Sequence, residues 1–329
     1  MKLIEKYDKV KFLGLVNDSP VLWYADHVEI ERNTIPIPDN ADLGNMDGIV
    51  DGKIGGKELV FQNGEFTDWP PIRYKDRIYG TLCSSQEYDG ENYRLSYEYK
   101  GKEFLFETRT NERLFLKVKI FLSNKSEDVI MFTSNREKKY LFYSKTGEFL
   151  WQYTEEDANL KINWKCIPVV DDVVVIISKY GARPKKIQGF NIRTGEQIWI
   201  IQSDAKYEPD TFHVGEDNML YGCRGYVVSP GIGITKLNPF TGDLEVTLVN
   251  KEEVFDSMPW NVTMHGRRLY YADNREGKEI GVIDVDRKEI VERQPLEIKK
   301  NVTIGAPVVT DDRMYVYIRE LKELRVYEL

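Results

Sequence analysis

Cysteine and histidine are scarce in this chain of 329 residues, which has three of each. The cysteines are Cys83, Cys166 and Cys223, and no two of them have the spacing of a CxxC pair. This separation argues against a metal or redox role, and a buried thiol behaves as a small apolar residue. We therefore expect structural cysteines, and their odd number agrees with a reducing compartment.

Long apolar stretches are also absent. No run approaches the roughly 18–20 residues that a membrane-spanning helix needs. The first residues, MKLIEKYDKVKF, are charged from the start and lack the apolar segment of a secretory signal. If the chain begins at its natural start, these features predict a cytoplasmic protein with no membrane association.

The sequence lacks the short motifs that usually carry chemistry. It has no GxSxG, HExxH or phosphate-binding loop, and no GxGxxG between a strand and a helix. Positive charge is not in excess, since 54 acidic residues face 46 Lys and Arg, which disfavours nucleic acid as a partner. We expect no catalytic residue, no metal and no cofactor, and we favour a protein that is not an enzyme.

What the chain has instead is a repeat. Its clearest copies are LFYSKTGEFLW at 141–151, GFNIRTGEQIW at 189–199 and KLNPFTGDLEV at 236–246. Each is an apolar strand, a tight turn with glycine and a second strand. Weaker copies complete a series of turns at positions 56, 101, 147, 195, 242 and 288, where the last has Lys288 in place of glycine. A period of about 47 residues held over six copies indicates one repeated structural unit.

Another strand pair lies upstream of the clearest turns, as in CIPVVDDVVVIIS at 166–178 and VTMHGRRLYYA at 262–272. Two hairpins per period make a four-stranded antiparallel unit, and periods in the forties are typical of β-propeller blades. We therefore predict an all-β fold, a single seven-bladed β-propeller over residues 1–329. Residues 323–329 align with the third strand of a blade, so we expect an N-terminal segment, either 2–7 or 9–14, to add the fourth strand and close the ring.

The turns also carry a more specific pattern. Thr146-Gly147 with Trp151, and Thr194-Gly195 with Trp199, resemble the repeats of the PQQ-like (quinoprotein-type) β-propeller family, whose units have a strand, a Thr-Gly turn and a docking tryptophan. Thr241-Gly242 keeps the turn but has Val246 in place of the tryptophan. The resemblance implies a β-propeller fold and suggests a quinone-dependent dehydrogenase as the enzyme hypothesis. Such enzymes are typically larger, exported and eight-bladed, with a calcium site and an adjacent disulfide, so the departures argue against that activity.

Residues 34–55 interrupt the repeat. They are rich in Pro, Gly, Asp and Asn, which predicts an irregular excursion from the first blade. Their aspartates, Asp39, Asp42, Asp47 and Asp51, lack the spacing of an EF-hand calcium loop. We expect a solvated loop and no metal site.

The connections between blades indicate where a partner would bind. Those at 62–70, 152–163, 202–211 and 249–261 hold eleven acidic residues and three lysines, interleaved with aromatics. This composition is typical of a surface that receives a basic protein. The predicted contact residues are Trp69, Glu155, Glu156, Asp157, Asp204, Tyr207, Glu208, Asp210, Glu252, Glu253, Phe255, Asp256 and Trp260. Alternatively, the aromatics pack beneath the loops and the acids only keep this face soluble.

The leading hypothesis is thus a non-catalytic, monomeric, protein-binding propeller with a basic partner, in the manner of an immunity or assembly protein. The alternative is a small-ligand-binding protein, or a hydrolase or lyase, with its site in the central channel. His213 and His265 are the candidates for that site, because they fall at nearly equivalent places on adjacent first strands, which line the channel. Proline occupies the aligned places at Pro168 and Pro307, so the fold itself does not need a histidine there.

Overall fold

The structure is a computed structural model. It describes residues 1–10, 12–16, 19–24, 27–30, 33–36, 42–43, 51–54, 57–62, 65–68, 72–74, 77–79, 85–88, 92–99, 102–109, 116–121, 129–134, 139–144, 148–162, 167–181, 183–203, 209, 211–226, 229–255, 261–275, 278–298 and 301–329. These belong to two compact units. Unit 1 comprises Met1–Lys11, Asp157–Asn191 and Glu196–Leu329, and unit 2 comprises Phe12–Glu156 and Ile192–Gly195. That the whole chain forms a single domain stays a prediction.

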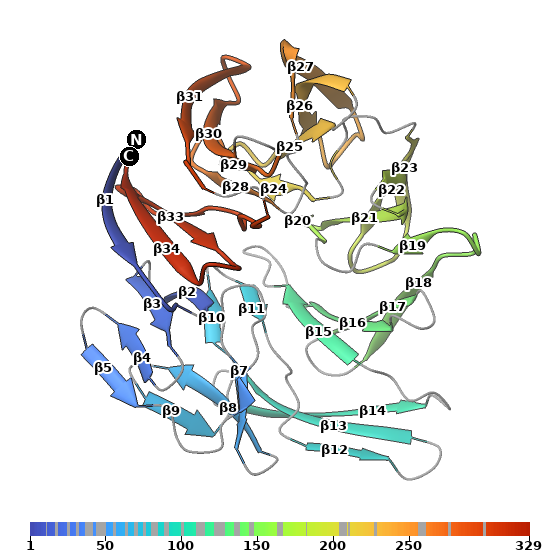
Figure 1. Cartoon of the computed structure of the whole chain (residues 1–329). Helices are drawn as coiled ribbons and strands as arrows, with labels where there is room; N and C mark the ends of the chain where they lie inside the picture. Colours follow the sequence, from blue (N-terminus) through green and yellow to red (C-terminus); the bar gives the residue numbers. More distant parts are fainter. Residues whose placement is uncertain are drawn as a thin grey trace. The chain divides into compact units, whose positions relative to one another are not determined.

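In both units the described secondary-structure elements are all strands, joined in antiparallel order, which confirms the predicted all-β class (Figure 1). One sheet of unit 1 contains β19 (Lys161–Ile162), β20 (Val169–Val170), β21 (Val173–Tyr180), β22 (Arg183–Asn191) and β23 (Gln197–Gln202). The next two contain β24 (His213–Val214), β25 (Leu220–Tyr226), β26 (Ser229–Leu237) and β27 (Leu244–Val254), and β28 (Val262–His265), β29 (Arg268–Asp273), β30 (Glu279–Asp284) and β31 (Glu289–Pro295).

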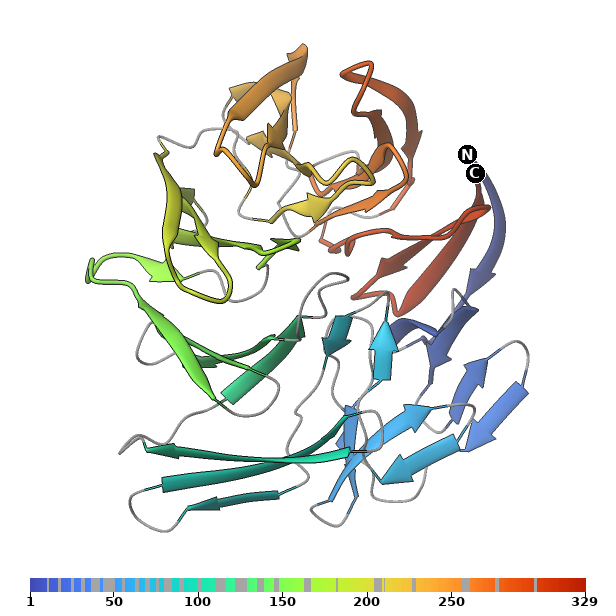
Figure 2. The ribbon, with the colours of Figure 1, turned by 180° about the vertical axis from the view of Figure 1, so that it is seen from behind.

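The last sheet of unit 1 joins the two ends of the chain. Its order is β1 (Lys2–Tyr7), β34 (Glu323–Glu328), β33 (Arg313–Ile318) and β32 (Val308–Val309). Lys2 pairs with Glu328 and Tyr7 with Leu324, and the view from behind shows β1 running along β34 (Figure 2). The segment 2–7 therefore supplies the fourth strand, as one of the two predicted alternatives requires.

Unit 2 follows the four-stranded pattern at its start. Its first two sheets are β2 (Phe12–Val16), β3 (Ser19–Trp23), β4 (His27–Ile30) and β5 (Asn33–Pro36), and β6 (Asp42–Leu43), β7 (Asp51–Ile54), β8 (Lys57–Gln62) and β9 (Glu65–Asp68). The described residues of 34–55 form strands of these two sheets, and the irregular excursion stays a prediction. A strand pattern was hard to see there because β6 and β7 are short and polar.

The rest of unit 2 departs from the repeat. A three-stranded sheet contains β12 (Ser85–Tyr88), β13 (Asn92–Tyr99) and β14 (Lys102–Arg109). A six-stranded sheet contains β10 (Ile72–Tyr74), β11 (Arg77–Tyr79), β15 (Leu116–Phe121), β16 (Val129–Ser134), β17 (Lys139–Ser144) and β18 (Phe149–Thr154). Part of the described chain therefore does not divide into four-stranded units.

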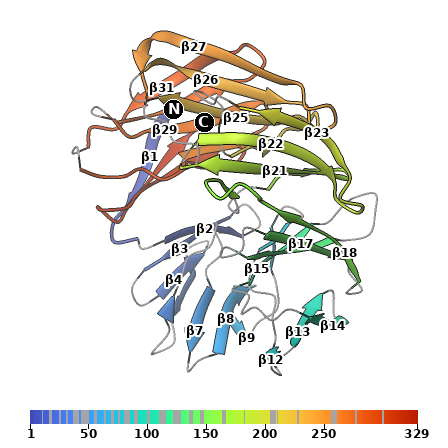
Figure 3. The ribbon, with the colours of Figure 1, turned by 90° about the vertical axis from the view of Figure 1, so that its right-hand side faces the viewer.

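Burial explains the sequence pattern of the strands in unit 1. The second strand of a sheet, such as β21 with VVVIIS buried throughout, is apolar on both faces because apolar side chains pack on each side of it. The fourth strands face solvent in part, as in β31, whose residues alternate between exposed and half-buried. The long strand β27 beside β26 is a further fourth strand (Figure 3).

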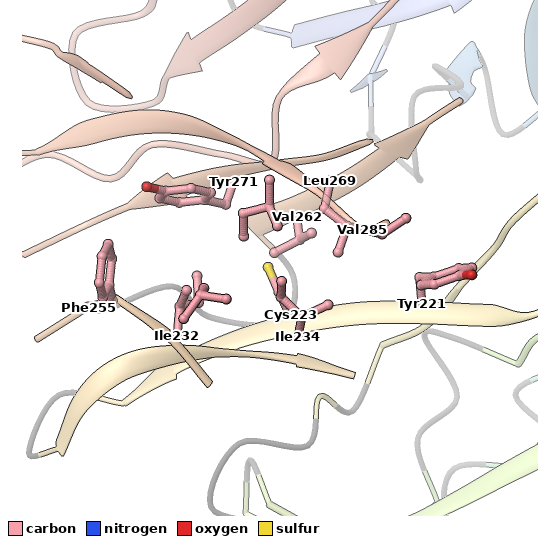
Figure 4. Packing of buried hydrophobic residues seen from close by; sticks show 11 residues of the cluster. Tyr221, Cys223, Ile232, Ile234, Phe255, Val262, Leu269, Tyr271 and Val285 are labelled. Atoms are coloured by element: carbon pink, nitrogen blue, oxygen red, sulfur yellow. The ribbon is translucent and has the colours of Figure 1, made fainter. Parts of the chain in front are cut away.

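One core cluster lies between the sheets β24–β27 and β28–β31. Cys223, Ile232 and Ile234 of the first sheet lie opposite Leu269 and Tyr271 of the second, and all five are at most 4% exposed (Figure 4). Burying such side chains stabilises the fold by roughly 1.5–3 kcal/mol each. The Cys223 thiol is part of this apolar packing, as expected from the sequence.

Two tryptophans of the repeat each pack on the Thr-Gly turn of the following repeat. In unit 1, the Trp199 indole packs on Gly242 and its Nε1 donates a hydrogen bond to the Pro239 carbonyl at 2.7 Å. In unit 2, Trp151 packs on Gly195 in the same way and donates to Ile192 O at 2.7 Å. Each glycine has a positive φ and leaves no room for a Cβ beneath the indole, so the Thr-Gly turn and the tryptophan before it form one contact.

Candidate partner-binding surface

The end of β27 lies within the connection that the sequence predicts for partner binding. The predicted loop 249–261 is a strand as far as Val254. Val249 pairs with Ile232 and Val254 with Pro230, so residues 250–253 lie opposite the single residue Gly231. Gly231 has φ +95° and Asn250 has φ +46°, and the extra residues of β27 form a special bulge, larger than the common two-against-one kind. The bulge leaves Lys251 and Glu252 exposed.

Glu253, the next residue, is bound by arginines of the following sheet. Arg293 donates two hydrogen bonds to its carboxylate, at 2.9 and 2.7 Å, and Arg275 Nη2 lies 3.7 Å away. The hydrogen bonds from Arg293 lower the pKa of Glu253 to about 2, with smaller contributions from Asn250 and Arg275. A basic partner would have to compete with these arginines, so Glu253 offers little free charge.

The same arginines extend inward to two buried acids. Arg293 Nη2 lies 2.8 Å from Glu279 Oε2, and the Tyr271 hydroxyl donates to Glu279 at 3.1 Å. Arg275 Nε lies 2.7 Å from the fully buried Asp273. Burial and the nearby Glu279 raise the pKa of Tyr271, which stays protonated. This network holds the ends of β27, β29 and β31 together.

The Phe255 side chain is buried beneath this surface. Its side chain has no exposed area and packs edge-on to Tyr271, with ring centroids 6.1 Å apart (Figure 4). The guanidinium carbons of Arg275 and Arg293 lie 5.0 and 5.6 Å from the centre of its ring. The structure thus supports, for this residue, the alternative that aromatics pack beneath the loops. The ring stabilises the arginine network by cation–π contacts.

The acids at 155–157 also differ in their surroundings. In unit 2, Glu155 is 5% exposed and accepts a hydrogen bond from the Tyr153 hydroxyl at 2.9 Å, so it too is a buried residue, whereas Glu156 is exposed. In unit 1, Asp157 is exposed and accepts a hydrogen bond from the Asn159 amide at 2.8 Å, which closes a turn. Glu156 and Asp157 remain accessible to a partner.

The other predicted contact residues lie outside the described part of the chain. They are Trp69, Asp204, Tyr207, Glu208, Asp210, Asp256 and Trp260. Their role stays a prediction.

The arginines at this end of the sheets were not predicted from the sequence. In an antiparallel four-stranded sheet, the turn between the second and third strands lies at the same end as the connection that leaves the fourth strand. The turn between β29 and β30 contains Arg275 and Lys278, and Lys278 donates to Asn274 O at 2.6 Å. The basic residues of the segment NREGK at 274–278 could have predicted positive charge at this end of the sheet.

The two histidines are not in equivalent positions. His213 pairs with Tyr221, one pair beyond the pair that closes its hairpin, whereas His265 pairs with Arg268 directly beside the turn. His265 Nε2 lies 2.9 Å from Oδ1 of Asp311, in the corresponding turn of the next sheet, and its side chain is 26% exposed. Tyr221 and Tyr270 correspond in the second strands, because their partners Lys236 and Val282 each lie two residues before a repeat turn. His213 and Thr263 pair with these two tyrosines, so they are the residues that match in register.

The described part of the chain lacks two further kinds of feature. It contains no group of three or more His, Cys, Asp or Glu side chains placed to hold a metal ion. Among the same residues there is no helix with the length and apolar character needed to cross a membrane.

Comparison with known proteins identifies the fold and nothing finer. No family model matches the chain, and no curated protein matches it in sequence. Solved structures similar to it include BamB from Moraxella catarrhalis (12% identity, TM-score 0.58, 99% of each chain covered) and Saccharomyces cerevisiae Sqt1 (10% identity, TM-score 0.58, 100% of each). A catalytically inactive variant of virginiamycin B lyase from Staphylococcus aureus with quinupristin is also similar (11% identity, TM-score 0.52, 99% of each). These proteins are β-propellers, so the chain has a propeller-like, all-β antiparallel fold.

Proposed function

We propose that this chain is a non-catalytic, cytoplasmic propeller that binds a basic partner protein through acidic side chains at the end of its sheets where β27 ends. We also propose that the fold has seven blades of the PQQ-like type and that the pairing of β1 with β34 closes them into a ring. A role as an immunity or assembly protein fits this reading.

The bulge of β27 carries the proposal. It presents Glu252 to solvent, and this carboxylate makes no ion pair with a described residue, whereas the neighbouring Glu253 is held by Arg293. Glu156 in unit 2 is likewise exposed and makes no ion pair with a described residue. Accessible carboxylates of this kind attract a positively charged partner and accelerate its association.

The test uses charge reversal at these two positions. Tagged wild-type protein, the Glu156→Lys/Glu252→Lys variant and a Glu216→Lys control are incubated with lysate of the source organism at low and moderate salt. Captured proteins are identified by mass spectrometry. Glu216 is exposed in the turn between β24 and β25, at the opposite end of its sheet from Glu252. Capture of a basic protein by wild type and control, lost in the double variant and at moderate salt, is expected. Equal capture by all three variants would contradict the proposal.

The alternative function, ligand binding or hydrolase or lyase chemistry with His213 and His265, has one supporting observation. A carboxylate 2.9 Å from the His265 imidazole can orient it as an acid–base group. Quinupristin, the compound in the lyase structure, is a suitable first probe. A rise in melting temperature with quinupristin, abolished by His265→Ala or His213→Ala, would favour this alternative over the protein-binding proposal.

A further inference from the structure

The four outer strands of unit 1 differ in how they are protected against pairing. β1, β23, β27 and β31 each end their sheet, with no described strand on the far side. An outer strand has unpaired N–H and C=O groups, and charged residues or proline usually protect such an edge from association. β1 has Lys2, Glu5 and Lys6; β27 has Glu245, Lys251, Glu252 and Glu253; β31 has Glu289, Glu292, Arg293 and Pro295.

β23 has no such protection. Its sequence, QIWIIQ, contains no charged residue and no proline. Ile198 and Ile200 are each 46% exposed, while Trp199 between them is 8% exposed and packs on the next sheet. The strand therefore combines an open backbone edge with two exposed isoleucines on one face.

The hydrogen bonds of β23 show which backbone groups are open. The Ser203 amide donates to Lys185 O at 2.9 Å, and the pairing runs without irregularity from Gln202 opposite Lys186 to Trp199 opposite Gly189. In an antiparallel ladder, hydrogen-bonded and non-hydrogen-bonded pairs alternate. Since Ser203 bonds toward β22, Ile200 and Gln202 direct their N–H and C=O groups away from the sheet.

We propose that β23 is the docking site for β23 of a second copy of this chain, in antiparallel register about a twofold axis at Ile200. In that register the outward N–H of each Ile200 donates to the outward C=O of the other copy's Ile200, so that the two residues form a hydrogen-bonded pair. The two Ile200 side chains then meet on the solvent face, which removes apolar surface from water. Gln202 lies opposite the partner's Ile198.

Charge indicates why the occupant is a second copy. When an outer strand pairs with the same strand of a second copy, each side chain faces the same residue of the other copy or one close to it in the sequence. Like charges that face each other in this way are destabilising. Such pairing of β27 would gather Glu252 and Glu253 from both copies, whereas β23 has no charge to repel. The contact is small, so we expect a reversible dimer that forms at high concentration. This differs from the monomer expected from the sequence and does not depend on the proposed partner protein.

Sedimentation velocity over a range of protein concentrations tests the proposal. The wild-type chain is expected to shift from monomer to dimer as concentration rises. Ile200→Lys removes the apolar contact of the two isoleucines and places two ammonium groups opposite each other, and it should weaken dimerisation at least about tenfold. Val291→Lys is the matched control, because Val291 is 38% exposed on the charged outer strand β31, and it should dimerise like wild type. A monomer at all concentrations, or equal loss of the dimer in both variants, would overturn the proposal.

A crosslinking variant provides a second, independent readout of the register. Hydrogen-bonded antiparallel pairs have Cα atoms about 5.5 Å apart, within the range that a disulfide bridges. Ile200→Cys should therefore form a covalent dimer under mild oxidation, in excess of wild type, which contains the same three native cysteines. Val291→Cys should not. Equal crosslinking of the two variants would contradict the assigned register.

Discussion

The Trp199 indole stands directly over Gly242, so that a Cβ added to this glycine would lie 2.8 Å from Cδ2 of the ring. Trp199 belongs to the outer strand of one sheet and Gly242 to the turn of the next. This contact, with the hydrogen bond to Pro239, fixes how the two neighbouring sheets meet at their outer edge.

Trp199→Ala removes both parts of this contact. We expect a loss of about 3–5 kcal/mol in the free energy of unfolding, because a large side chain that is 8% exposed leaves a cavity and an unpaired carbonyl. Urea unfolding followed by circular dichroism measures it. Val246→Ala is the matched control, since Val246 takes the place of the tryptophan in the next repeat and is 38% exposed, and it should cost less than about 1 kcal/mol. Similar losses in both variants would contradict the docking role.

Gly242→Ala tests the other side of the contact. Gly242 has φ +79° and lies beneath the indole, whereas Gly266 has φ +55° with nothing within 4 Å of an added Cβ. Gly266→Ala should therefore cost only about 1–2 kcal/mol for the left-handed backbone, and Gly242→Ala should cost about 1–3 kcal/mol more because the indole is displaced. The comparison uses the same unfolding measurement. If the two variants lose the same stability, the indole does not need the glycine.

Thr235→Val should stabilise the protein. The Thr235 side chain in β26 has no exposed area, and its hydroxyl has no hydrogen-bond partner among the described residues. Replacing this hydroxyl by a methyl group should raise the free energy of unfolding by about 1 kcal/mol. Thr310→Val is the control, because the 7% exposed Thr310 donates to Asp312 at 3.2 Å and should lose stability. A loss in Thr235→Val would indicate a bound partner for that hydroxyl.

Acid should weaken the protein partly through Glu253. Because Arg293 depresses the folded-state pKa of Glu253 to about 2, its ionised form stabilises the fold at pH values above the ordinary carboxyl range, and this contribution is lost as pH falls toward 2. Urea midpoints measured between about pH 5 and about pH 2 should fall less steeply for Glu253→Gln than for wild type. Glu252→Gln, which removes the neighbouring exposed carboxylate, should follow the wild-type curve. Parallel curves for wild type and Glu253→Gln would show that the arginine contacts are not formed in solution.

The repeat was predictable because its turns need a particular backbone. Lys288 was aligned with the glycines of the other turns, and the structure gives it φ +57°, the left-handed conformation that the alignment requires. The preceding repeat has Val246 at the place where Trp151 and Trp199 stand in their repeats, so no indole of that repeat covers Lys288. The repeat that lacks the tryptophan, at Val246, is thus followed by the turn that lacks the glycine, at Lys288. Both replacements can be read from the sequence.

The candidate surface was less predictable, for a physical reason. Whether a residue near the end of a strand is exposed depends on the register of the last residue pairs in the sheet. One residue more or fewer in the bulge of β27 would shift that register and turn the following side chains to the other face. Glu252 and Glu253 are adjacent and chemically alike, yet one is exposed and the other is bound by Arg293. Phe255 was indistinguishable from an exposed aromatic in the sequence, because its burial depends on arginines from the next repeat.

The pairing of β1 with β34 has a consequence for biosynthesis. Lys2 is made long before its partner Glu328, so the first strand must wait without its sheet while the intervening repeats form. Contacts between such distant residues are slow to form, and an unpaired strand is exposed to aggregation while it waits. The charged residues of KLIEKY would keep that waiting strand soluble until β34 has been made.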